Sequence, residues 1–73
     1  MPKRYSGRKI TKTLEKAGFY QVSQKGSHIK FKGLRKGEIR TVVVPDHKEV
    51  AVGTFHSILR QAAMTKEEFE NYL

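Results

Sequence analysis

The chain has 73 residues and no cysteine, so it allows one small domain without a deep cleft and excludes disulfides, thiolate nucleophiles and zinc–cysteine sites. No apolar run approaches the roughly 18 residues that a membrane span needs, and no signal peptide opens the chain, which predicts a cytoplasmic protein. The net charge of +8 is concentrated before residue 61, which favours a polyanion partner, nucleic acid first and an acidic protein second.

Residues 1–5 are expected to form a loosely held basic start, followed by a helix over residues 7–17. Ser6 is a good N-cap residue for this helix. Ile10 and Leu14 belong to a single apolar stripe, because residues four apart lie on the same side of a helix. The helix should therefore pack against the rest of the protein on one side only.

Three strands are expected next, over residues 19–24, 27–32 and 38–44. Gly26 fits a tight turn between the first two strands, because glycine adopts positive φ angles without strain. The segment GLRKG, residues 33–37, has glycine at both ends and is expected to join the second strand to the third. Links this short predict an antiparallel meander.

The second strand alternates between polar and apolar side chains. Successive side chains of a strand point to opposite faces, so Ile29 and Phe31 should face the core. His28, Lys30 and Lys32 should then point outward. The third strand is ambiguous because its two faces are nearly equally apolar. Whichever face points outward leaves valine exposed, which could form a partner-binding patch.

Two further helices complete the predicted fold. The first begins near Gly53 or Thr54 and carries an apolar stripe, and the capping box Thr65–Glu68 opens a short C-terminal helix. The predicted class is α+β, with the order α-β-β-β-α, a three-stranded antiparallel sheet, both main helices on one face and a short C-terminal helix. We expect residues 1–73 to form a single domain.

His28 is the first candidate for chemistry. Its predicted position is outward, Lys30 follows roughly 7 Å along the same face, and Gly26 and Ser27 come just before it. A lone histidine is more often structural, so position alone leaves both interpretations open. His47, which follows the end of the third strand, could equally serve a turn or contact a ligand.

The carboxylates are scattered along the chain, and there is no phosphate-binding glycine loop, so we expect neither a metal site nor a cofactor. RNA cleavage needs neither, because RNA supplies its own nucleophile, the 2′-hydroxyl. An imidazole with a reference pKa of about 6.5 can move the proton, and lysines can stabilise the charge on phosphorus. The surface could therefore be a minimal, metal-independent ribonuclease. The alternative is a non-catalytic RNA-binding module of the same architecture.

Five segments carry a resemblance to a known family. They are the Ser-Gly pair at residues 6–7 that opens the first helix, LEKAGF at 14–19, QKGSHIKF at 24–31, VVVPDH at 42–47 and GTFHSILRQAAMTKEEF at 53–69. In these segments the chain resembles the HicA-type toxins, the small mRNA interferases of bacterial toxin–antitoxin systems. The Gly-Ser-His element is the most specific part. Lys9 departs from the acidic residue often found early in the first helix.

The resemblance implies a double-stranded-RNA-binding-like α-β-β-β-α fold and translation-independent mRNA cleavage by an endoribonuclease, with His28 as the catalytic histidine. It also implies a HicB-type antitoxin, acidic at the contact surface, that covers the active surface. The candidate substrate-binding residues are Lys30, Lys25, Lys32, Ser27 and Gly26. His47 matches a family position whose role stays open.

Overall fold

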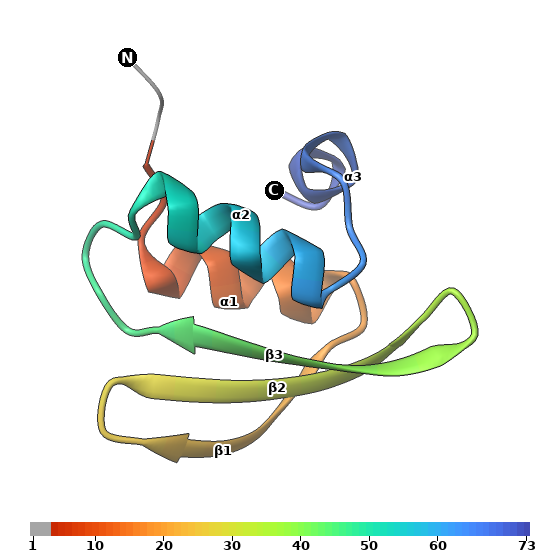
Figure 1. Cartoon of the computed structure of the whole chain (residues 1–73), viewed down its shortest axis with the longest axis horizontal. Coiled ribbons are helices and arrows are strands. Elements are labelled where there is room, and N and C mark those ends of the chain that lie inside the picture. The colour runs from red at the N-terminus through yellow and green to blue at the C-terminus, as the bar shows by residue number, and fades with distance from the viewer. Residues whose placement is uncertain (1–3) are drawn as a thin grey trace.

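The computed structural model describes residues 4–73. Along the chain its elements are α1 (Gly7–Lys16), β1 (Tyr20–Lys25), β2 (His28–Arg35), β3 (Glu38–Pro45), α2 (Val52–Gln61) and α3 (Lys66–Asn71) (Figure 1). The three strands form one antiparallel sheet in the order β1-β2-β3. The predicted α+β class, the element order and the antiparallel meander are therefore confirmed.

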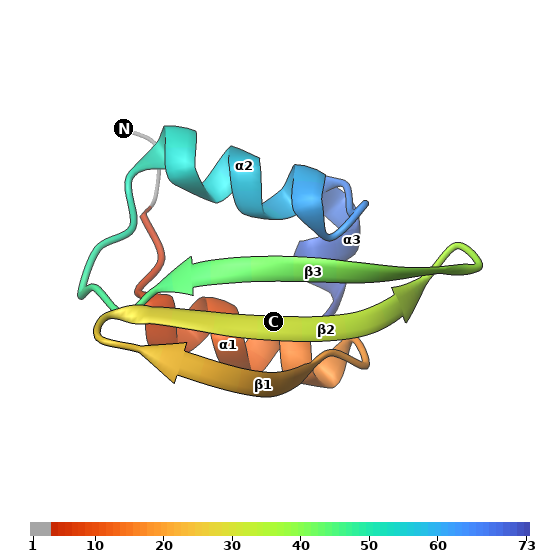
Figure 2. The same ribbon diagram turned by 60° about the horizontal axis from the view of Figure 1, so that its bottom comes forward.

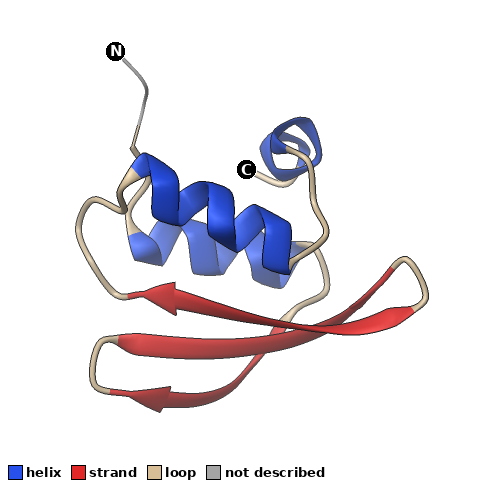
Figure 3. Ribbon diagram, viewed as in Figure 1, coloured by secondary structure: helices blue, strands red, loops and turns tan. Residues whose placement is uncertain are grey.

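The molecule has two layers, with the helices on one side of the sheet (Figure 3). Figure 2 shows the sheet from the other side, where no helix of residues 4–73 lies in front of it. The prediction that both main helices share one face of the sheet is correct. One face of the sheet is therefore covered, and the other is open.

The core lies between the sheet and the helices. Ile10 and Leu14 of α1 are fully buried there, together with Phe31 of β2. Val42 and Val44 are buried as well, whereas Val43 between them is 37% exposed. This settles the ambiguity of the third strand, because the covered face takes the set that contains two valines. Val43 is the valine left on the outward face.

The predicted connection over residues 33–37 is wrong, because β2 continues through Gly33 to Arg35. Only Lys36 and Gly37 form the turn, with φ angles of 53° and 80°, as a two-residue type I′ turn requires. Gly33 is glycine for a different reason. A Cβ atom there would lie 2.8 Å from ring carbons of Phe19, so the strand needs glycine to let this ring pack across it.

The N-terminus of α1 is fastened to the end of β3. The Gly7 N–H donates to the carbonyl of His47 at 2.8 Å, and the Ser6 hydroxyl caps the helix by accepting from Lys9 N–H at 3.0 Å. A Cβ atom on Gly7 would overlap the carbonyl oxygen of Pro45. Glycine at position 7 therefore allows α1 to begin directly against the chain that follows β3.

The expected loose start at residues 1–5 is wrong at its last residue, and residues 1–3 lie outside the described residues. The Tyr5 side chain is only 9% exposed, and its ring centroid lies 5.2 Å from that of Phe55 and 5.3 Å from that of Phe69. Aromatic rings at this separation pack favourably. Tyr5 therefore joins the segment before α1 to α2 and α3.

The predicted capping box opens α3, with Thr65 and Glu68 each accepting the other's backbone N–H. Glu68 also forms an ion pair with Arg35 at 2.9 Å, which connects the end of β2 to α3. The Thr65 N–H, and then the Arg35 guanidinium, lower the pKa of the Glu68 carboxyl below its ordinary value. Arg35 thus serves the fold rather than the open side of the sheet.

Candidate functional site

The candidate site is the open face, by which we mean the side of the sheet away from the helices. Strand register identifies the side chains on it, because directly paired residues point to the same face. They are Tyr20, Ser23 and Lys25 of β1, His28, Lys30, Lys32 and Leu34 of β2, and Ile39, Thr41 and Val43 of β3. The predicted outward position of His28, Lys30 and Lys32 is confirmed, since all three are exposed.

One end of this face gathers positive charge around His28. Lys25 is directly paired with His28 across the β1–β2 hairpin, which places their Cβ atoms about 5 Å apart. Lys30 follows two residues along β2 on the same face, about 7 Å away. We call Lys25, His28 and Lys30 the histidine end. Three of the predicted site residues are therefore brought together.

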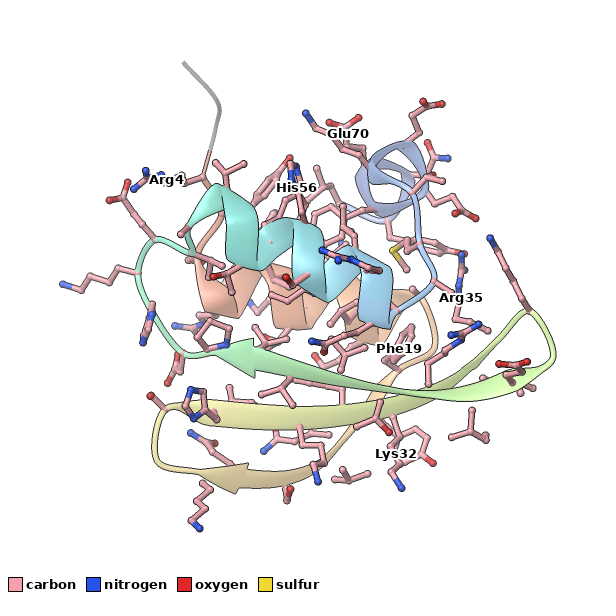
Figure 4. All side chains as sticks on the ribbon, in the orientation of Figure 1. Arg4, Phe19, Lys32, Arg35, His56 and Glu70 are labelled. Atoms are coloured by element: carbon pink, nitrogen blue, oxygen red, sulfur yellow. The ribbon has the colours of Figure 1, made fainter. Side chains whose placement is uncertain are left out.

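The other end of the open face is apolar. Leu34 and Ile39 are paired across β2 and β3 and are 66% and 64% exposed, and Tyr20 is 56% exposed. We call these three residues the apolar end. Lys32 lies between the two ends, paired with Tyr20, and points away from the helices (Figure 4). The sequence reasoning missed Leu34 because it assigned this residue to a turn.

Gly26 and Ser27 shape the turn that leads into His28. Gly26 has a φ angle of 59°, and its carbonyl accepts from the Gln24 side-chain amide at 3.1 Å. The Ser27 carbonyl accepts from the Asp46 N–H at 2.6 Å, which ties the turn to the end of β3. Both residues are exposed, so this backbone role leaves the Ser27 hydroxyl accessible.

A hollow of about 520 Å³ opens beside β3. It is lined by His28, Val43, Pro45, His47, Glu49, Ala51, Thr54 and Gln61. The Gln61 side-chain oxygen accepts from the Val43 N–H at 2.9 Å, so α2 caps the edge of β3 here. The structure therefore brings His47 and His28 to one hollow. Sequence reasoning missed Glu49, Thr54 and Gln61, because only tertiary packing brings α2 and the segment before it to this edge.

The lysines of the open face are not engaged in ion pairs. Over residues 4–73 the ion pairs are Arg35–Glu68 and Arg40–Glu38, at 2.9 and 3.4 Å. Lys25, Lys30 and Lys32 take part in neither, so their charge is available to a bound anion. Across the same part of the chain, no three His, Asp or Glu side chains lie close enough to hold a metal ion.

A second hollow, of about 340 Å³, lies in the helical layer between the segment before α1, α2 and α3. Arg4, His56 and Glu70 line it, and Figure 4 shows them on the side of the molecule away from Lys32. His56 is exposed, as its position next to the core stripe of α2 predicted. This hollow is therefore separate from the histidine end.

Comparison with protein families decides what kind of chain this is. Residues 7–64, which include the whole sheet, α1 and α2, match the family described as the HicA toxin of bacterial toxin–antitoxin systems. The chain belongs to the HicA toxin family. It is thus a toxin of a toxin–antitoxin system, and such a toxin has an antitoxin partner. A search of curated proteins finds no match to the toxin.

The resemblance seen in the sequence is therefore confirmed at the level of the family. The match contains His28, His47 and every residue of the open face, whereas α3 lies beyond it. Within residues 4–73 of the toxin, no helix is long and apolar enough to cross a membrane.

Proposed function

We propose that the toxin is a metal-independent endoribonuclease that cleaves mRNA in the cytoplasm, with His28 as its catalytic residue. One observation carries the proposal: in a chain of the HicA family, an exposed imidazole stands between two unpaired lysines on an open sheet face. An extended RNA strand can reach such an open face.

The reaction follows from what these residues can do. The RNA 2′-hydroxyl attacks the adjacent phosphorus, and the imidazole of His28 moves a proton during this step. The ammonium groups of Lys25 and Lys30 stabilise the negative charge that develops on the phosphoryl oxygens. Lys32, farther along the strand, binds a neighbouring phosphate, and the exposed turn at Gly26 and Ser27 contacts the substrate beside the histidine.

The alternative, a non-catalytic RNA-binding module, has less support. Double-stranded-RNA-binding domains typically hold phosphates with lysines at the start of their second main helix. In the toxin, α2 begins with Val52, Gly53 and Thr54, and its basic residue, Arg60, is in the last turn. The positive charge of the sheet lies instead around a histidine, which binding alone does not require.

We further propose that the antitoxin is of the HicB type and covers the open face. The apolar end offers it a contact of exposed leucine, isoleucine and tyrosine side chains beside Lys32. A partner with apolar side chains surrounded by acidic ones complements this arrangement. Bound there, it would block RNA from the adjacent histidine end.

Purified toxin incubated with RNA in EDTA tests the catalytic proposal. We expect cleavage that leaves 2′,3′-cyclic phosphate ends, and a His28→Ala variant slower by about 10²–10⁴-fold, the usual contribution of a general acid or base. His56→Ala is the matched control, because His56 is also exposed but lies in the helical layer; it should cleave like the wild type.

Urea melts accompany this assay. His28 is exposed, so His28→Ala should change the free energy of unfolding by no more than about 0.5 kcal/mol. Equal cleavage by wild type and His28→Ala, or cleavage by neither, would contradict the assignment. Cleavage that disappears in EDTA and returns with added Mg²⁺ would contradict a metal-independent reaction.

A further inference from the structure

His47 also lies in a position suited to catalysis. Resting on the ribonuclease activity proposed above, we infer that His47 is a second catalytic residue. In this inference His28 is the general base, which removes the 2′-hydroxyl proton, and His47 is the general acid, which protonates the leaving 5′-oxygen. Four features of the structure lead to this assignment.

First, backbone hydrogen bonds hold the His47 segment both to the His28 segment and to the start of α1. The Asp46 N–H donates to the carbonyl of Ser27 at 2.6 Å, so the residue before His47 is bonded to the residue before His28. The carbonyl of His47 itself accepts from the Gly7 N–H at 2.8 Å. The chain around His47 is therefore fixed relative to His28, as catalytic groups must be.

Second, the two imidazoles share one hollow. Its volume of about 520 Å³ falls within the roughly 300–1,000 Å³ typical of small-molecule sites. The hollow runs from His28 on the open face around Pro45, at the end of β3, to His47. This volume is large enough for a scissile phosphate, and both histidines border it.

Third, the His47 side chain makes no hydrogen bond or ion pair with any other part of residues 4–73. It is exposed, and the hydrogen bond at this residue uses its backbone carbonyl, which any amino acid would supply. The backbone hydrogen bond at this turn therefore does not require histidine at position 47. The imidazole is free to act on a bound molecule.

Fourth, the charges around the two rings differ. Lys25 and Lys30 flank His28, whereas Glu49 lines the hollow with His47. A carboxylate can accept a hydrogen bond from a ring N–H and so orient the imidazole of His47, whereas the ammonium groups beside His28 can only donate. Asp46 and Lys48 are the charged chain neighbours of His47, and α1, bonded to His47 through Gly7, carries Arg8 as its next residue. From α2 the hollow receives only the uncharged Thr54 and Gln61.

The reaction balances without a co-reactant. His28 accepts the 2′-hydroxyl proton as the 2′-oxygen forms a bond to phosphorus. The bond from phosphorus to the 5′-oxygen breaks, and this oxygen takes the proton of His47. The products are a 2′,3′-cyclic phosphate and a free 5′-hydroxyl; His28 then gives its extra proton to solvent, and His47 takes one from solvent.

A substrate whose leaving group needs no proton separates the two roles. After the cleavage site in an RNA oligonucleotide is mapped, the bridging 5′-oxygen at that site is replaced with sulfur, which leaves as a thiolate. On ordinary RNA we expect His47→Ala to be about 100-fold slower than the wild type. On the sulfur substrate it should be within about threefold of the wild type. His28→Ala should be slow on both substrates.

The pH dependence gives a second readout. A reaction that needs one deprotonated base and one protonated acid slows at both low and high pH, so the wild-type rate should follow a bell-shaped profile. His47→Ala should lose the fall on the alkaline side. Lys48→Ala, a change at the adjacent exposed residue, is the control and should keep the bell. His47→Gln keeps a polar side chain that can fill the same space but cannot act as an acid. It should therefore show the same pH profile as His47→Ala.

The outcomes separate this inference from the function on which it rests. Wild-type cleavage that His28→Ala abolishes and His47→Ala leaves unchanged would overturn the role of His47 and leave the ribonuclease standing. Equal slowing of His47→Ala on both substrates would also overturn the acid role. If the wild type cleaves neither substrate, the proposed ribonuclease itself is wrong.

Discussion

At the scale of single residues, the side chains around His28 on the open face are exposed and are not part of the core. His28, Lys25 and Lys30 are exposed, and none of the three takes part in an ion pair of residues 4–73. Lys25 and Lys30 are diagonal neighbours across the β1–β2 pair on this face, so their two positive charges repel each other and cost a little stability. A bound phosphate offsets this repulsion, and we therefore expect these lysines to bind the phosphate groups of a substrate.

Lys30 offers the clearest test of phosphate contact. Lys30→Ala should weaken RNA binding about equally for different sequences and reduce the slope of log K against log salt by about 0.7–1, because one phosphate contact is lost. Binding is measured by fluorescence anisotropy at several salt concentrations, on the His28→Ala background to prevent cleavage. Lys66→Ala, an exposed lysine at the start of α3, is the control. An unchanged slope for Lys30→Ala would exclude the contact.

At the scale of elements, the junction between α1 and the end of β3 positions the site. Gly7 permits the close approach of the helix to Pro45, and its N–H holds the carbonyl of His47. A side chain at residue 7 would have to displace backbone atoms, which are less able to move than the end of a side chain. The contacts of Gly7 therefore both begin α1 and hold the segment that carries His47 in place.

Gly7→Ala should therefore destabilise the toxin by about 1–3 kcal/mol, the usual cost of forcing extra atoms into a packed site. It should also slow RNA cleavage, because the segment that carries His47 must shift. The matched control is Gly53→Ala in α2, where an added Cβ atom meets nothing within 4 Å. Alanine at this position should leave the free energy of unfolding unchanged or raise it by up to about 1 kcal/mol. Urea melts and initial rates measure both effects. A Gly7→Ala toxin as stable as the wild type would contradict this account.

The sequence predicted most elements because their patterns are local. The alternation through Ile29 and Phe31 correctly placed His28 outward, and the capping box at Thr65 correctly opened α3. Two features were not predictable in this way. Gly33 was interpreted as a turn residue, although its small size serves the ring of Phe19, a contact that only the folded chain creates. The choice between the two faces of β3 likewise depends on which side the helices cover.

In the candidate site, too, local patterns predicted some features and tertiary contacts determined the others. Lys30 and Lys32 were placed on the open face from alternation alone, whereas the pairing of Lys25 with His28 depends on the register of the hairpin. The approach of His47 to His28 depends on a hydrogen bond between segments nearly 20 residues apart, which no local pattern reveals. Sequence therefore identified the chemical groups, and the fold determined which of them meet.

At the scale of the whole molecule, the open face is divided between two surfaces of different character. The histidine end carries charge and suits RNA, and the apolar end carries large exposed side chains and suits a protein. Within residues 4–73, these surfaces lie on the side of the sheet that no helix covers (Figure 2). A partner seated on the apolar end therefore needs to extend only along β2 to block the histidine end.

This division predicts that antitoxin binding can be lost while RNA cleavage is kept. Leu34→Glu removes an apolar contact and places a negative charge where an acidic partner would sit. Burial of a leucine side chain contributes about 1.5–3 kcal/mol, so we expect the dissociation constant of the toxin–antitoxin complex to rise at least tenfold. RNA cleavage by the free variant should stay within about threefold of the wild type, because Leu34 lies six residues from His28 along β2.

Binding is measured by titrating the toxin with its purified antitoxin, and cleavage is measured in the same preparation with and without the antitoxin. Leu73→Glu provides the matched control, since Leu73 is 40% exposed but lies outside the sheet; its complex should be as tight as that of the wild type. A Leu34→Glu toxin that still binds tightly would show that the antitoxin docks elsewhere. We expect Leu34→Glu to bind the antitoxin weakly and to cleave RNA even when the antitoxin is present. This result would mean that the antitoxin docks on the apolar end and inhibits cleavage by extending from there over the histidine end.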